Sequence, residues 1–233
     1  DPLNGYLPAG WTLAEWEERR ERDPAATVLA AKRSMAAHVE AMLGFHRAGA
    51  FDKVVDIREC WLQAEPSNAI RNAAREIALE QGLEFYDVRH HRGFLRNLMI
   101  RLTTTGEVML LFSFARDDRK AIQAYLSAIL ERFREQITTI VYCINPKKND
   151  TVFDLEMVSW FGKGFVVEQL GDLRFKIGPK SFFQTNSVQA KNLYDVVVQF
   201  AGLTGAENVY DLYTGTGSRS EEHTSELQSL RHL

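Results

Sequence analysis

The residues best suited to bind a ligand lie near the end of the chain, at 207–218 (ENVYDLYTGTGS). The apolar and aromatic positions predict a buried strand that runs into a glycine-rich turn. Glycines after a strand let the backbone turn sharply and approach a ligand closely. The pattern is typical of the opening of a nucleotide-type α/β domain. By itself it is weak, because Gly-x-Gly follows strands in many folds, and a plain tight turn stays open.

A second segment with suitable chemistry lies upstream, at residues 175–186 (FKIGPKSFFQTN). Pro179 removes a backbone donor and predicts a turn, and Phe182 and Phe183 offer faces for stacking. Gln184 and Asn186 carry amide groups that can bind a polar ligand or a base edge. The alternative is a strand end with core aromatics, and the residues alone favour neither interpretation.

Taken together, these two segments resemble the bacterial RNA uracil-C5-methyltransferases, in particular the 23S rRNA enzymes. The resemblance extends back to Gly44, through residues 44–49 (GFHRAG), 54–62, 96–101 (RNLMIR) and 145–150. It implies the family's central domain followed by the entrance of its methyltransferase domain. It also implies S-adenosylmethionine as the cofactor and RNA as the partner, with rRNA favoured over tRNA.

The resemblance assigns cofactor contacts to this sequence residue by residue. Those expected to contact S-adenosylmethionine or shape its pocket are Gln184, Tyr213, Ser218, Asp211, Gly215 and Gly217. In this family a cysteine thiolate adds to uracil C6, C5 takes the methyl group, and a glutamate base removes the C5 proton. The target base must also leave its stack. Both catalytic residues lie downstream of the glycine turn in the family, so we assign no catalytic residue here.

Cys60 aligns, by the same resemblance, with the cysteine that supplies the fourth ligand of an iron–sulfur cluster in some members. The other three ligands come from an N-terminal C-x5-C-x2-C run, which this chain lacks. We therefore expect no cluster in this chain. A truncated N-terminus, a branch without the cluster, and a merely buried cysteine all stay open.

Composition is that of an ordinary globular chain and gives no hint of a membrane. The 233 residues are 45% hydrophobic with a formal charge of −3, so no global basic excess points to nucleic acid. Two cysteines are too few for a disulfide framework, and no signal segment or apolar run of about 18 residues appears. We expect a cytoplasmic protein with no membrane partner; its oligomeric state stays open.

Local basic clusters occur at residues 89–92 with Arg96, and at 146–148. They are either solvated surface or contacts to RNA phosphates. A metal site at the adjacent His90 and His91 is not expected, because neighbouring side chains on a strand point apart and no third ligand is evident.

The periodicity predicts an α+β central domain followed by the incomplete opening of a Rossmann-like α/β methyltransferase domain. The expected organisation is a helical segment over 1–43 opened by a Thr12–Glu15 capping box, the central domain over 44–174, and the start of the methyltransferase domain over 175–218. Within these, helices are predicted at 66–81, 119–133 and 187–201, with a hairpin of strands at 97–103 and 107–115.

The last residues, 219–233, look foreign to the protein. Residues 219–229 (RSEEHTSELQS) match the translation of a widely used sequencing adapter. We therefore exclude them from the fold and expect a C-terminally truncated fragment.

Two functions remain open at this point. The first is methylation of uracil C5 in RNA by the full-length protein, of which this fragment is inactive because it lacks the catalytic Cys and Glu. Within this first class the substrate is rRNA or, alternatively, tRNA. The second is a non-catalytic RNA-binding module.

Overall fold

The computed structural model describes residues 12, 15, 18, 22 and 43–210 of the chain. It divides into two compact units, residues 1–96 and 97–233, with the division inside strand β3. In the described ranges no helix is long and apolar enough to cross a membrane. The domain boundaries expected at residues 43 and 174 stay predictions.

The first unit contains a small hairpin and a helix. Strands β1 (Phe45–Arg47) and β2 (Ala50–Val55) pair antiparallel, and α3 spans Ser67–Glu80. The apolar residues that predicted this helix, Ile70, Ala73, Ala74, Ile77 and Ala78, are its buried face. Gly82, with φ of 64°, follows the helix end and confirms the predicted stop. The capping box also forms, since Thr12 N and Glu15 N each donate to the other residue's side chain.

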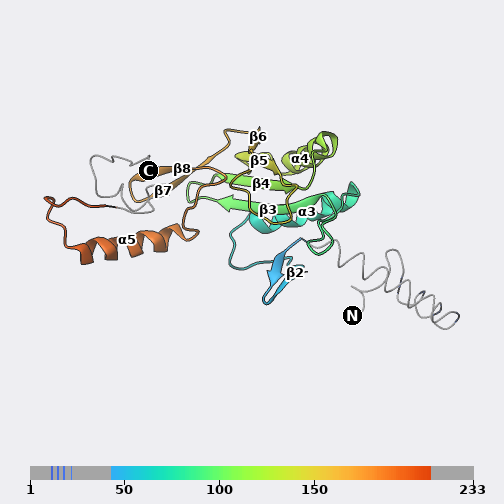
Figure 1. Ribbon diagram of the computed structural model, residues 1–233, viewed down its shortest axis with the longest axis horizontal. Coiled ribbons are helices and arrows are strands. Elements are labelled where there is room, and N and C mark those ends of the chain that lie inside the picture. The colour runs from blue at the N-terminus through green and yellow to red at the C-terminus, as the bar shows by residue number, and fades with distance from the viewer. Residues whose placement is uncertain (1–11, 13–14, 16–17, 19–21, 23–42, 211–233) are drawn as a thin grey trace. The chain divides into compact units, whose positions relative to one another are not determined.

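The second unit is built on a mixed four-stranded sheet in the order β3-β4-β5-β6 (Figure 1). Its strands are β3 (Leu95–Leu102), β4 (Val108–Phe114), β5 (Thr139–Ile144) and β6 (Val158–Phe161). Helix α4 (Arg119–Phe133) links the parallel strands β4 and β5, and β6 pairs antiparallel with β5. A mixed sheet with a crossover helix confirms that helices and strands combine in this region, which was expected as an α+β central domain, whereas the Rossmann-like opening stays a prediction.

Strand β4 is buried along its whole length because both faces of the sheet are covered. On one face, the Tyr125 ring of α4 lies edge-on to Phe112 and Phe114, at 5.6 and 6.4 Å. On the other face, Met109 and Leu111 join a hydrophobic cluster with residues of three further elements. These elements are β7 (Val166–Leu170), β8 (Leu173–Ile177) and α5 (Ser187–Ala201).

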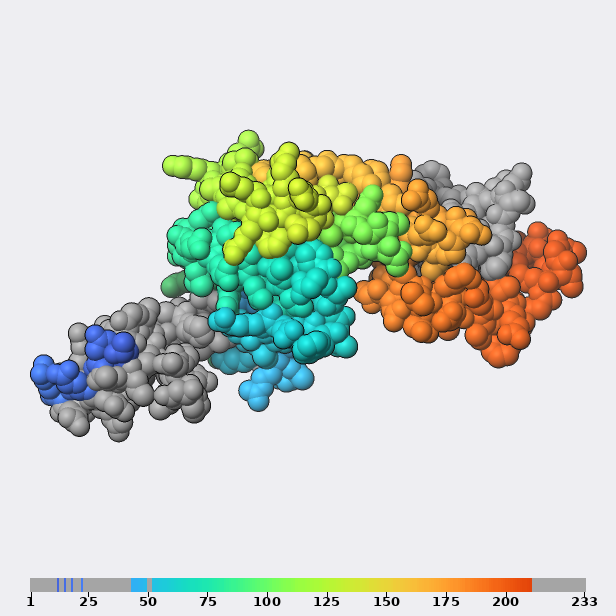
Figure 2. All heavy atoms as spheres, turned by 180° about the vertical axis from the view of Figure 1, so that it is seen from behind, coloured from blue at the N-terminus to red at the C-terminus, as the bar shows by residue number. Residues whose placement is uncertain are grey.

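Strands β7 and β8 form an antiparallel hairpin that the sequence indicated only as short strands. Helix α5 packs Ala190 and Tyr194 into the cluster, whereas Leu193, Val197 and Phe200 are exposed. Figure 2 shows α5, orange to red, with much of its length at the surface.

The turn between β3 and β4 is tied to β7 by side chains. Thr105 Oγ1 donates to Val167 O at 2.6 Å, and Glu107 accepts from Val167 N at 2.7 Å and from Lys163 Nζ at 2.6 Å. Burial alone would raise the pKa of Glu107, but these hydrogen bonds and the Lys163 charge hold it below the ordinary value. The main sheet and the β7–β8 hairpin are therefore joined by polar contacts as well as by the core.

The strand expected at residues 207–213 is not seen in the described part. Residues 207–210 belong to no strand, and Val209 and Tyr210 are exposed. A buried strand needs a neighbour to satisfy its backbone hydrogen bonds, and residues 207–210 pair with none among the described strands. The rest of the expected strand and its glycine turn lie outside the described residues.

Candidate cofactor and RNA site

The segment that the sequence singled out begins with a closed turn after β8. Ser181 N donates to Gly178 O, and Gly178 N donates to Ser181 Oγ, both at 3.1 Å. Pro179 occupies the second position of this turn, where its fixed φ is favourable. The turn predicted from Pro179 is confirmed.

Arg101, on β3, binds the same turn from the sheet. Its Nη2 donates to Ser181 O at 3.0 Å and its Nη1 to Gly178 O at 3.4 Å. The side chain is partly buried, and this burial lowers the pKa of its guanidinium. One arginine thus engages both carbonyl oxygens that frame the turn.

The two phenylalanines that follow the turn have different environments. Phe183 packs against the hydrophobic cluster, with its ring centroid 5.7 Å from that of Phe175. Phe182 is 75% exposed, and Gln184 is also exposed. Phe183 is therefore a core aromatic, as the alternative interpretation expected, while ligand binding by the exposed Phe182 and Gln184 stays a prediction.

The segment ends at the start of α5, where polar side chains fix it. Asn186 caps the helix by accepting from Gln189 N at 3.0 Å. Ser187 Oγ donates to Glu168 Oε2 at 3.1 Å, and Glu168 Oε1 accepts from Thr104 N and Gln169 N. The Asn186 amide was expected to bind a ligand. For its oxygen this expectation is wrong, because that atom already accepts the hydrogen bond that caps α5.

One carboxylate is influenced by lysines of both the turn and the 146–148 cluster. Lys147 Nζ lies 2.5 Å from Asp154, and this hydrogen bond, aided by the charges of Lys147 and Lys180, lowers the pKa of Asp154. Lys180 belongs to the turn itself and is exposed, as is Lys148, the neighbour of Lys147 in sequence.

Of the cofactor residues implied by the resemblance, only Gln184 lies among the described residues. Asp211, Tyr213, Gly215, Gly217 and Ser218 fall outside them. An exposed primary amide has the donors and acceptor that a polar cofactor needs, so the chemistry of Gln184 fits that assignment. The assignment itself stays a prediction.

The other basic cluster forms a tight loop over residues 86–92. His90 Nδ1 lies 2.5 Å from Asp87 Oδ2, and hydrogen bonds from the His90 side chain and from the His90 and Arg89 amides hold the pKa of Asp87 at about 2. His91 turns to the Tyr86 hydroxyl instead, at 3.3 Å. Arg89 pairs with Asp52, so part of this cluster's charge is neutralised within its own unit.

The two cysteines differ in burial. Cys143 is 0% exposed within β5. Cys60 is half-buried, and its backbone N and O both bond the Asn68 side chain. Among the described residues no group of three or more His, Cys, Asp or Glu side chains could hold a metal ion.

Arg101 and Glu168 are the site residues that sequence reasoning missed. Each acts on residues 60 to 80 positions away in the chain, as the contacts of Glu168 to Thr104 and of Arg101 to Ser181 show. No local pattern marks such partners. Asn186 did carry a signal, because Asn immediately before a predicted helix is a typical N-cap.

Comparison with known proteins gives one family-model match and a set of curated relatives. Residues 1–82, about a third of the chain, match the Urocanase Rossmann-like domain. A Porphyromonas gingivalis RNA methyltransferase is 52% identical over 178 residues, covering 76% of this chain and 38% of the relative. A Bacteroides thetaiotaomicron RNA methyltransferase is 50% identical over 179 residues, covering 76% and 39%. The chain thus spans less than two fifths of these relatives.

A solved structure also resembles the chain in fold. The tRNA (uracil-54, C5)-methyltransferase of Pyrococcus abyssi, in complex with S-adenosyl-L-homocysteine, superposes with a TM-score of 0.60 at 29% identity. The match covers 76% of this chain and 42% of that one. Over the stretch that it shares with them, the chain is therefore similar in sequence to RNA methyltransferases and in fold to a tRNA uracil-C5-methyltransferase.

Proposed function

We propose that this chain is part of an S-adenosylmethionine-dependent enzyme that methylates uracil C5 in RNA, with rRNA as its substrate. The observation that carries the proposal is the outward presentation of Phe182 and Gln184 on a segment fixed at both ends. The P. abyssi neighbour, named for uracil C5 and solved with S-adenosyl-L-homocysteine, supports both the chemistry and the cofactor.

Each exposed residue has a distinct task in this proposal. The Gln184 amide hydrogen-bonds the cofactor, and the Phe182 ring offers a stacking face to an unpaired base. Lys180, with Lys147 and Lys148, attracts the RNA backbone. S-adenosylmethionine, when bound, supplies the electrophilic methyl group. We expect the unmodified chain by itself to show neither methyl transfer nor tight cofactor binding.

The test requires a protein of the relatives' full length. We define the hybrid as residues 1–218 of this chain continued by the C-terminal part of the B. thetaiotaomicron relative. Transfer of a labelled methyl group to rRNA, and not to tRNA, is the expected result. No transfer to either RNA by a folded hybrid would contradict the proposal.

Two variants and the unmodified chain refine the test. Gln184→Ala in the hybrid should weaken S-adenosylmethionine binding at least tenfold while leaving RNA affinity nearly unchanged, because a hydrogen bond to a charged ligand contributes about 1.5–3 kcal/mol. Asn192→Ala, an exposed amide on α5, is the matched control. The unmodified chain should not reach a micromolar dissociation constant for the cofactor by calorimetry.

A tRNA substrate is the second candidate, favoured by the name of the P. abyssi neighbour. Methyl transfer to tRNA in the same assay would select it. RNA binding by the hybrid without any transfer would instead favour the non-catalytic RNA-binding module.

A further inference from the structure

We propose that Arg101 is a positioning residue that aims Phe182 and Gln184 at their ligands by locking the preceding turn. The proposal rests on the proposed function for the identity of those ligands. The clamp itself rests on contacts within the second unit.

The first step is the geometry of the clamp. The two terminal nitrogens of Arg101 reach the carbonyl oxygens of Gly178 and Ser181, which are also the two residues closing the turn between themselves. A planar guanidinium presents its donors in a fixed fork, so engaging two acceptors restrains their relative orientation. The Ser181 carbonyl belongs to the peptide group that leads directly into Phe182.

The second step is the rigidity of the support. Arg101 lies two residues before the turn that Thr104, Thr105 and Glu107 tie to β7. The backbone of Arg101 is therefore fixed relative to the β7–β8 hairpin, and the 178–181 turn follows directly after that hairpin.

The third step is the restraint on the far side of the exposed residues. Phe183 is held by the core, and the Asn186 cap and the Ser187–Glu168 hydrogen bond fix the start of α5. Between these two restraints, Phe182 and Gln184 combine exposure with an aromatic ring or an amide that can bind a ligand. Removing the arginine frees one end of a short segment whose other end stays in place.

The chemistry of Arg101 agrees with a positioning role. Its terminal nitrogens donate to neutral carbonyl oxygens, whereas an arginine kept for stability through charge would be expected to face a carboxylate. Lysine would keep the charge but concentrates its donors on one nitrogen, so it can only partly restrain the turn.

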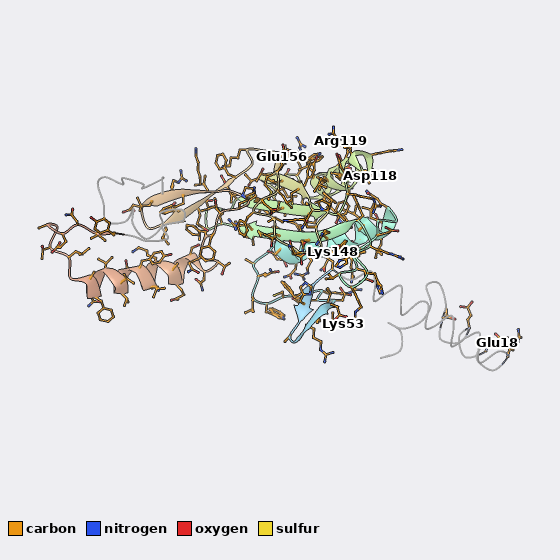
Figure 3. The ribbon with its side chains drawn as sticks, in the orientation of Figure 1. Glu18, Lys53, Asp118, Arg119, Lys148 and Glu156 are labelled. Carbon is orange, nitrogen blue, oxygen red and sulfur yellow. The ribbon has the colours of Figure 1, made fainter. Side chains whose placement is uncertain are left out.

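The test compares Arg101→Ala and Arg101→Lys with Arg119→Ala as the matched control. Arg119 is an exposed arginine at the start of α4, beside Asp118 in Figure 3. In the full chain, amide hydrogen exchange of residues 181–184 should rise at least tenfold in Arg101→Ala, less in Arg101→Lys, and not in the control. Exchange in β4 and α4 should stay unchanged in all three.

The second readout is cofactor affinity in the hybrid. Arg101→Ala should weaken S-adenosyl-L-homocysteine binding about tenfold, with Arg101→Lys partly restoring it, as expected when a Gln184 hydrogen bond is misaligned. Unchanged exchange at 181–184, or raised exchange with wild-type cofactor affinity, would overturn the inference. If the unsubstituted hybrid binds no cofactor, the proposed function fails, and the exchange measurement alone decides whether the clamp exists.

Discussion

Glu168 offers the sharpest test of how this site is held together. Its side chain is 5% exposed and accepts hydrogen bonds from Thr104 N at 3.0 Å, Gln169 N at 2.9 Å and Ser187 Oγ at 3.1 Å. The Thr104 hydroxyl donates to it as well. One carboxylate therefore joins the β3–β4 turn, β7 and the first residue of α5.

The expected cost depends on which partners lose their acceptor. In Glu168→Gln the amide oxygen can keep the bonds on one side, and the Ser187 hydroxyl can rotate to accept from the new NH2 group. In that variant the free energy of unfolding of the second unit should fall by about 1 kcal/mol, because the hydrogen bonds are weaker and the negative charge at the start of α5 is lost. In Glu168→Leu the buried Ser187 Oγ loses its partner, whereas water can still reach the exposed residues Thr104 and Gln169. Leaving this buried donor unpaired, together with the loss of the other hydrogen bonds, should cost about 2–3 kcal/mol.

The assay has to isolate the second unit, because the chain divides into two units and a whole-chain melt would mix them. Amide hydrogen exchange of β4 and β5 under increasing urea gives the free energy of unfolding of that unit. Glu131→Gln, an exposed carboxylate on α4, is the control and should change it by less than about 0.5 kcal/mol. A Glu168→Leu variant no less stable than Glu168→Gln would refute the reasoning.

Three further outcomes are expected. Phe183→Ala should lower the stability of the second unit by about 2–3 kcal/mol, whereas Phe182→Ala should lower it by less than about 0.5 kcal/mol, as read by the same exchange method. Asn186→Ala should cost about 1 kcal/mol and Asn186→Asp almost nothing, measured as exchange in the first turn of α5. Because the folded pKa of Asp87 is about 2, below its ordinary 3.8, its contribution to the 86–92 loop is fully present above pH 4 and is lost as the pH falls through about 2. Exchange of that loop against pH should show this loss, and Asp87→Asn should abolish the pH dependence.

The sequence predicted the helices of the second unit more accurately than its strands. Helices α4 and α5 begin and end at the predicted residues, Arg119–Phe133 and Ser187–Ala201, because each combines helical periodicity with a polar N-cap, Asp118 or Asn186. Strands β7 and β8 were expected only as unspecified short strands. Their pairing depends on a Gly171 turn and on a core shared with β4, which local alternation does not encode.

The candidate site was also predicted only in part. Residue type pointed to Phe182, Phe183 and Gln184 as candidates, since an aromatic ring can stack and an amide can hydrogen-bond a polar ligand. It could not separate Phe182 from Phe183, because only the packing against Phe175 makes the second ring structural. The role of Arg101 could not be predicted from the sequence either, because its partners are backbone carbonyls 77 and 80 residues away.

Within the 182–186 segment, the residues that stabilise the fold differ from those available to a ligand. The core contact of Phe183 and the helix cap of Asn186 contribute to stability, whereas the exposed Phe182 and Gln184 contribute little to it. A side chain that contributes little to stability can be chosen for its ligand alone. The position of that side chain, in contrast, is set by residues distant in sequence, so changes at Arg101 or Glu168 should affect ligand binding without touching the ligand.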